Sequence, residues 1–205
     1  MNLSTFLRSF VLAASAAAPA LAQTVVVRGE LVDGRATGCY YCPQVQFAIK
    51  YSETPVRSST IALAQFLGQQ VELTGTWNGS TTSPAIDVTS AQIVAETLTI
   101  NGSGRIGDRF RFSAHGTPGS LAVNAGAAAH GFVVPFGAGL AMLLEPVTTF
   151  VFGIGFVAGD GEFKTDVRIP NNPAFIGMRV FSQSLLTPSG GALFATNPRA
   201  DSVLP

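Results

Sequence analysis

Residues 68–77, which read GQQVELTGTW, decide the fold expected for this chain of 205 residues. Apolar and polar side chains alternate over residues 71–77, a pattern that is typical of a strand with one buried face. Asn78-Gly79 follows at once and is a strong signal for a turn. Residues 84–94 (PAIDVTSAQIV) predict the next strand, so strands joined by turns build this part of the chain.

Two more strands are expected before this stretch. Residues 24–31 (TVVVRGEL) are rich in β-branched residues and end at the turn Asp33-Gly34. Residues 45–51 alternate between apolar and polar side chains. Between these strands and the opening stretch, residues 58–67 predict a short helical turn.

The order strand, strand, short helix or loop, strand, turn, strand over residues 23–97 resembles an OB-fold barrel. OB folds are small barrels that bind oligonucleotides, oligosaccharides or proteins through one face and its loops. The resemblance therefore implies a binding role, and it implies that the loop 33–44 between the first two strands borders the ligand face.

A change in composition near residues 96–101 predicts a second module, 98–205. Every Tyr, Trp and Cys lies before residue 98, whereas 11 of the 13 Phe that follow residue 22 lie after it. Short alternating strands separated by Gly- and Pro-rich turns predict an antiparallel β-sandwich there. Residues 147–157 are expected to place Phe150, Phe152, Ile154 and Phe156 on one face. The fold class is therefore all-β, with an OB-like barrel before a sandwich.

Three motifs carry a second resemblance: GTPGS at 116–120, VPFGAGLAMLL at 134–144 and RIPNNPAFIGMRVFSQSLL at 168–186. They resemble a recurrent C-terminal β-sandwich domain of secreted planctomycete-type bacterial proteins. The resemblance covers about 100 residues, carries no catalytic residues and implies an accessory, extracytoplasmic role. Within it, the apolar stretch 131–157 is predicted to form two buried hairpin strands, because it is interrupted and a membrane span needs roughly 20 apolar residues.

The first 22 residues read as a secretory signal peptide. Arg8 precedes the apolar run 10–18, and Ala20-Leu21-Ala22 is an A-x-A cleavage site before Gln23. The alternative is an uncleaved anchor, for which an apolar run of about 9 residues is too short. We therefore expect a secreted, periplasmic or envelope protein with no transmembrane span after cleavage.

Charge argues against a nucleic-acid partner. Charged residues make up 12% of the chain, against roughly 25% in an average soluble domain. Residues 23–97 carry 4 basic and 6 acidic side chains, a net charge of −2, and residues 98–205 carry 7 and 6, a net charge of +1. A nucleic-acid module would be markedly basic. The one basic cluster, Arg105, Arg109 and Arg111, is expected to face solvent or to pair with carboxylates on a neighbouring strand.

Cys39-Tyr40-Tyr41-Cys42 is a C-x-x-C motif, for which we expect a structural disulfide because the chain is exported and all-β. Redox catalysis, the alternative, needs the first Cys at a helix N-terminus, but Pro43 and a strand follow. Zinc needs four ligands and there is no other Cys, so no metal is expected. Tyr40, Tyr41 and Trp77 are candidates for stacking on a ligand ring. In the alternative, Trp77 packs over a barrel end and the tyrosines cover the core edge.

No set of catalytic residues emerges. Residues 102–107 (GSGRIG) match the G-x-G-x-x-G pattern, but a strand follows where a dinucleotide site needs a helix, so we expect a turn and no cofactor. His115 and Ser120 have no evident carboxylate partner, and Asp160 and Glu162 flank a turn. The leading hypothesis is a non-enzymatic module that binds an envelope or extracellular protein or glycan. The alternatives are a structural protein that self-associates through sheet edges and an extracytoplasmic thiol–disulfide protein.

Overall fold

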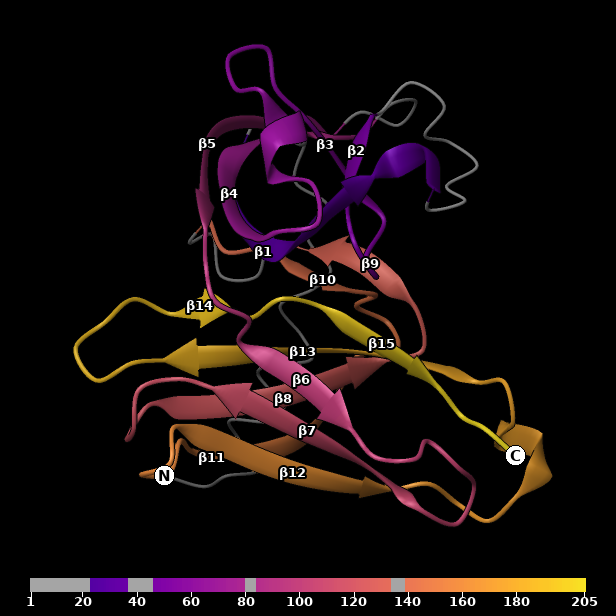
Figure 1. Ribbon diagram of the computed structural model, residues 1–205. Helices are drawn as coiled ribbons and strands as arrows, with labels where there is room; N and C mark the ends of the chain where they lie inside the picture. The colour runs from indigo at the N-terminus through magenta and orange to yellow at the C-terminus, as the bar shows by residue number, and fades with distance from the viewer. Residues whose placement is uncertain (1–22, 37–45, 80–83, 134–138) are drawn as a thin grey trace.

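A computed structural model describes residues 23–36, 46–79, 84–133 and 139–205. The signal peptide predicted for residues 1–22 lies outside them. The fold is all-β, as predicted: a closed barrel, a two-stranded hairpin and two larger sheets. In Figure 1 the barrel lies at the top, the two larger sheets lie below it, and the hairpin lies between. Among the described residues, no helix is long and apolar enough to cross a membrane.

The barrel closes in the order β1-β2-β3-β5-β4, with β4 paired back onto β1. All pairs are antiparallel except β3 with β5. This order is compatible with the OB-like barrel expected from the sequence. The strands are β1 (Gln23–Asp33), β2 (Phe47–Ile49), β3 (Thr54–Arg57), β4 (Gln70–Trp77) and β5 (Ile86–Ile93), with the short 3-10 helices η1 (Gly34–Ala36) and η2 (Leu63–Phe66) between them.

Strand β3 is the barrel strand that the sequence pattern missed. It has only four residues, TPVR, and contains Pro55, which lacks a backbone N–H and lowers the strand signal. Tertiary pairing makes it a strand nevertheless, because β2 and β5 flank it on its two sides. The short helical segment before β4 is η2, whose Leu63 is buried in the barrel.

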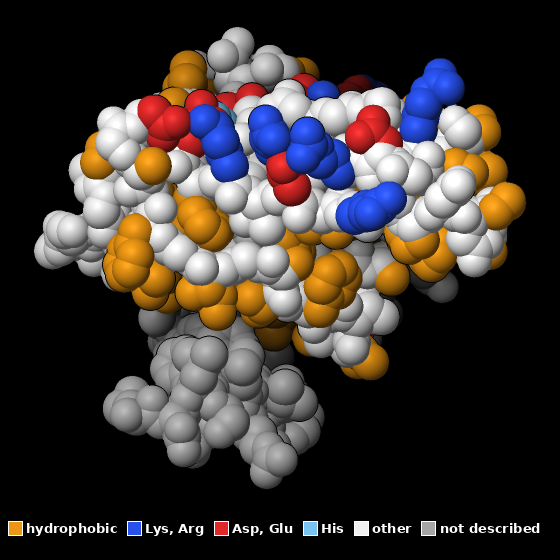
Figure 2. Space-filling model, turned by 90° about the horizontal axis from the view of Figure 1, so that it is seen from below, with side chains coloured by type: hydrophobic (Ala, Val, Ile, Leu, Met, Phe, Trp, Pro, Cys, Tyr) orange, Lys and Arg blue, Asp and Glu red, His pale blue; other side chains and the backbone are white. Residues whose placement is uncertain are grey.

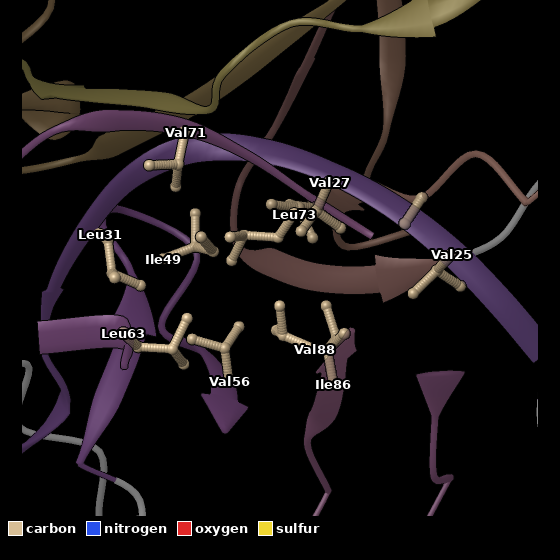
Figure 3. Close-up of a cluster of buried hydrophobic side chains, with 12 residues drawn as sticks. Val25, Val27, Leu31, Ile49, Val56, Leu63, Val71, Leu73, Ile86 and Val88 are labelled. Atoms are coloured by element: carbon tan, nitrogen blue, oxygen red, sulfur yellow. The ribbon is translucent and has the colours of Figure 1, made fainter. Parts of the chain in front are cut away.

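The barrel core contains side chains from both halves of the sequence. Alternate residues of β1 and β4 point inward, as the alternation predicted for β4, and Figure 3 shows them meeting those of the other strands. Ala141 and Leu143, which come from far beyond the barrel strands, complete the same cluster. Its buried members are Val25, Val27, Leu31, Ile49, Val56, Leu63, Val71, Leu73, Ile86, Val88, Ala141 and Leu143.

A hairpin of β9 (His130–Val133) and β10 (Met142–Leu144) brings these two side chains to the barrel. Val26 N–H donates to the Gly139 carbonyl at 2.6 Å, so β1 is bonded to the chain just before β10. The opposite face of β10 packs on the larger sheet below. There the buried Gln183 accepts a hydrogen bond from Leu143 N–H at 2.8 Å. The division at residues 97 and 98 stays a prediction, and this hairpin reaches across it.

The two larger sheets are antiparallel and face each other. The first holds β11 (Phe150–Phe156), β8 (Leu121–Ala127) and β13 (Arg179–Thr187), with β14 (Phe194–Ala195) and β15 (Arg199–Ser202) both paired to β13. The second holds β12 (Glu162–Arg168), β7 (Arg109–His115) and β6 (Leu98–Asn101). The 3-10 helix η4 (Pro173–Phe175) precedes β13. Side chains of both sheets form shared buried clusters, so the predicted sandwich is confirmed.

The apolar stretch 131–157 is organised differently from the prediction. Strand β10 is buried, but β11 is an edge strand whose side chains are largely exposed. The expectation of two buried hairpin strands was therefore wrong for the second of them. The hairpin already covers the middle of the sheet, and β11 lies beyond that cover at the sheet's edge.

Candidate functional site

Of the aromatic residues predicted to bind a ligand, the structure describes Trp77. Tyr40 and Tyr41 lie outside the described residues, as do Cys39 and Cys42, so the tyrosine site and the disulfide stay predictions. The Trp77 indole stacks on the Phe132 ring of β9, with centroids 4.0 Å apart and planes inclined by 17°. Trp77 also packs against the barrel core. This contact agrees with the interpretation in which Trp77 closes a barrel end.

A hollow of about 310 Å³ lies on the barrel where β3 and β5 run parallel. Its charged groups, Arg57 and Asp87, pair with each other, and this hydrogen bond raises the pKa of Arg57. Ser58 Oγ donates to the Val88 carbonyl at 2.7 Å and accepts from Thr60 N–H at 3.2 Å. The polar groups of this hollow are thus largely bonded to one another.

The residues considered for catalysis are engaged in separate local contacts. His115 Nε2 lies 3.1 Å from Thr99 Oγ1, while Ser120 Oγ donates to the Thr117 carbonyl at 2.6 Å. Asp160 bonds the Lys164 ammonium at 2.9 Å, and this contact lowers the pKa of the carboxyl. Within the described ranges, no three His, Cys, Asp or Glu side chains gather as a metal site would require. Asp160 and Glu162 both contact Lys164, and Glu162 lies opposite His115 in the strand register. The hydrogen bonds given above for His115, Ser120 and Asp160 nevertheless go to three different neighbours.

The outer face of the smaller sheet is charged. Arg111 donates to Asp166 at 2.7 and 2.9 Å, and Arg109 reaches the same carboxylate at 3.1 Å. The hydrogen bonds from Arg111 lower the pKa of Asp166 and raise that of Arg111. Two arginines of the basic cluster thus pair with a neighbouring strand, as the sequence predicted. Figure 2 shows a row of basic and acidic side chains on one side of the molecule, with hydrophobic side chains gathered beside it.

Large apolar side chains are exposed at the edge of the larger sheet. On the outer face of β11 they are Val151, Ile154 and Phe156, exposed by 38%, 56% and 68%, and Leu121 of the adjacent strand β8 is exposed by 37%. All four lie on one face, because Phe156 pairs with Leu121, Ile154 with Val123 and Val151 with Ala125. We call this set the β11 strip. Phe150 of β11 is also exposed, by 50%, but it lies on the other face, where it pairs with Gly126. Residues 146–159, which contain the whole of β11, include no charged residue.

A β-bulge decides which side chains join the β11 strip. The register shifts between Val151 and Gly153, so Phe152 is the extra residue and the faces switch after it. Phe150 and Phe152 lie on the inner face, where the Phe152 ring is 4.6 Å from that of Phe112. Ile154 and Phe156 lie on the outer face. The prediction that these four residues share one face was therefore wrong, because strict alternation does not allow for a bulge.

Gly153 and Gly155 explain why the large side chains of β11 point outward beyond the bulge. A Cβ on Gly153 would lie 2.4 Å from Thr165 Oγ1, and one on Gly155 would lie 2.5 Å from the Phe163 ring. The smaller sheet thus approaches so closely that only glycine fits. The sequence G-I-G-F carried this signal, because glycine at alternate positions marks the face that another sheet covers.

An apolar cavity of about 120 Å³ lies at the same end of the sandwich as the start of β11. Five phenylalanines line it: Phe110, Phe112, Phe150, Phe152 and Phe175. Dry apolar cavities of similar size, about 150 Å³, admit a benzene ring. The cavity opens on the inner face of β11, whereas the β11 strip lies on the outer face.

Comparison with known proteins adds no relative: no family model matches the chain, and no curated protein and no solved structure matches it either.

Proposed function

We propose that this protein is an exported, non-enzymatic interaction module that binds a protein partner through the β11 strip. The observation that carries the proposal is the exposure of Ile154 and Phe156, 56% and 68%, on a strand without charge. Soluble proteins rarely leave contiguous apolar side chains exposed unless they contact something. Export rests on the signal peptide predicted for residues 1–22.

The absence of enzymatic activity is part of the proposal. His115, Ser120 and Asp160 each bond a different neighbour, and nucleophilic catalysis needs such groups linked in one chain of hydrogen bonds. The resemblance of residues 98–205 to an accessory domain of secreted proteins supports the same conclusion. A thiol–disulfide activity would depend on Cys39 and Cys42 alone.

The OB-like barrel supports a second candidate function, which is binding of a glycan or another ring-bearing ligand. The observation in its favour is the barrel itself, since the loop containing Tyr40 and Tyr41 is expected to border the ligand face of such a fold. Trp77 does not strengthen it, because Trp77 pairs with Gln23 at the start of β1, whereas that loop follows Asp33 at the other end of the strand. Stacking of Trp77 on Phe132 occupies one face of the indole. For this reason we rank glycan binding below the β11 strip.

The test uses immobilised mature protein, residues 23–205, exposed to an envelope and secreted fraction of the producing cells. Wild-type protein is expected to retain a partner that Phe156→Glu loses, and purified partner should bind the variant at least about tenfold more weakly. Lys164→Glu, which introduces the same side chain at an exposed position of β12, is the matched control and should retain the partner. Equal retention by wild type and Phe156→Glu would refute the β11 strip as the contact surface.

A separate assay addresses catalysis. We expect no turnover of a panel of ester, peptide and glycoside substrates by the mature protein. Turnover that His115→Ala abolishes would contradict the non-enzymatic assignment.

A further inference from the structure

We infer that the partner of the β11 strip is a second copy of this chain, bound through antiparallel pairing of β11 with β11 about a two-fold axis at Gly155. The inference rests on the proposed function, because it names the partner of the same surface. The pairing would join the sheet that contains β11 in one molecule to the same sheet in the other, so that the two form one continuous sheet.

The backbone of β11 has free hydrogen-bonding groups along its outer edge. Val157 N–H donates to the Ser120 carbonyl, and Gly119 N–H donates to the Val157 carbonyl, both at 2.9 Å, so Val157 faces the β8 side. Because this direction alternates along an antiparallel strand, Ile154 and Phe156 direct their N–H and C=O groups away from β8. On that side β11 has no neighbour among the described strands.

The same two residues therefore offer both open backbone groups and exposed apolar side chains. A two-fold axis at Gly155 sets Ile154 of one copy opposite Phe156 of the other, and the reverse. Both pairs would exchange backbone hydrogen bonds, with Cα atoms about 5.5 Å apart. Pairs of an aromatic and a β-branched side chain are among those that stabilise neighbouring strands. At the axis, Gly155 meets Gly155 and no side chain intervenes.

Two adjacent registers also keep the apolar side chains on the same face, but each of them pairs these side chains less favourably than an axis at Gly155 does. An axis at Ile154 would place Phe156 opposite Phe152 of the second copy, where the bulge breaks the regular spacing. An axis at Phe156 would set Phe156 against Phe156 of the second copy but would leave both Ile154 side chains opposite the small Ala158. The bulge thus limits the regular edge and favours an axis at Gly155.

Because β11 carries no charged residue, a second copy of the chain is the expected partner of its open edge. Two-fold pairing brings each part of the strand close to its own copy, so a charged residue on the edge would meet a like charge. Residues 146–159 contain none. Edge strands are commonly protected from pairing by charges or Pro, and the regular part of β11, residues 153–157, has neither.

The oligomeric state of the mature protein, residues 23–205, tests the inference. Sedimentation equilibrium is expected to give a mass that rises from monomer to dimer with concentration, with the dimer present at or below about 1 mM. Phe156→Glu should weaken the association at least about tenfold, and Lys164→Glu should leave it unchanged. Circular dichroism and thermal unfolding of each variant confirm that it is folded.

A mixing experiment tests the register. In the inferred dimer, Ile154→Lys in one copy lies opposite Phe156→Glu in the other. The two variants should therefore associate more strongly when mixed than either does alone, as native mass spectrometry would report. Preferential heterodimers support the axis at Gly155, and equal or weaker association on mixing overturns it.

The outcomes separate the inference from the proposed function. A wild-type protein that stays monomeric up to about 1 mM refutes self-pairing. If Phe156→Glu still loses a partner from the envelope fraction in that case, the β11 strip binds another protein and the proposed function holds. A dimer that Phe156→Glu leaves intact places the dimer contact elsewhere and overturns the inference.

Discussion

Strands β11 and β12 form the same side of the sandwich but present opposite chemistry to solvent. Each is the edge strand of its sheet, and they face one another through Gly155 and Phe163. The exposed outward residues of β12 are Lys164, Asp166 and Arg168, whereas β11 exposes Ile154 and Phe156. Charges on an edge strand discourage pairing with another chain. The difference suggests that β12 is closed to partners and that β11 is left open to them.

Strands β11 and β12 border one buried core, and a cavity in that core should lower the free energy of unfolding more than any other change considered below. Phe112 is 1% exposed and contacts Phe152 of the bulge. Phe112→Ala is expected to lower the free energy of unfolding by about 4 kcal/mol, because it leaves a cavity between the sheets. Urea denaturation measures this change. A loss below about 1 kcal/mol would mean that the sheets do not pack as described.

The close approach of β11 to β12 predicts the next largest loss of stability. Gly155→Ala should destabilise the protein by about 2 kcal/mol, because its Cβ would overlap the Phe163 ring. Gly159→Ala is the matched control, since a Cβ there meets nothing within 4 Å, and should change stability by less than about 0.5 kcal/mol. Equal unfolding free energies for the two variants in urea would contradict the glycine-dependent contact.

The charges of β12 predict a smaller effect that depends on pH. The pKa of Asp166 is lowered chiefly by hydrogen bonds from Arg111. The stabilisation is therefore present above the unfolded pKa of about 3.9 and is lost as the pH falls through the lower folded pKa. Asp166→Asn should be less stable than wild type at pH 7, and the difference should shrink below about pH 4. Thermal unfolding across this range measures it, and a difference that grows toward acid would contradict the ion pair.

The exposed side chains of β11 predict the smallest effect on stability. Ile154→Thr should change the free energy of unfolding by less than about 0.5 kcal/mol, because Ile154 is mostly exposed in the monomer. Ile169→Thr makes the same change at a position just after β12 that is 4% exposed, and should cost about 2 kcal/mol. Denaturation must be measured at a concentration where the chain is monomeric. Similar losses at both positions would show that Ile154 serves the fold and is not reserved for a partner.

Much of the barrel could be predicted from the sequence because β4 alternates regularly, β1 is rich in β-branched residues and turn signals separate the strands. The pattern found β1, β4 and β5, and the core positions on β1 and β4 follow that alternation. Strand β3 escaped detection because four residues with a proline carry little local signal, and only its pairing with β2 and β5 makes it a strand.

The β11 strip could be predicted less well. The sequence shows four large apolar residues at alternate positions, which is equally consistent with one buried face. The bulge at Phe152 and the closeness of β12 divide these residues between two faces, and both are consequences of tertiary packing. Local alternation also carries no information on which strands lie at the edge of a sheet.

The hairpin β9–β10 has a consequence for how this chain folds as it is synthesised. Ala141 and Leu143 belong to the barrel core but are made long after the last barrel strand, β5. In a nascent chain that ends before them, the five-stranded barrel has an incomplete interior, and completing it requires a contact of high sequence separation. Because domains generally fold from the N-terminal side during synthesis, we expect the barrel to remain open until the hairpin emerges. Barrel and sandwich should then become stable together, so a truncation anywhere before residue 144 would leave the whole chain exposed to proteases.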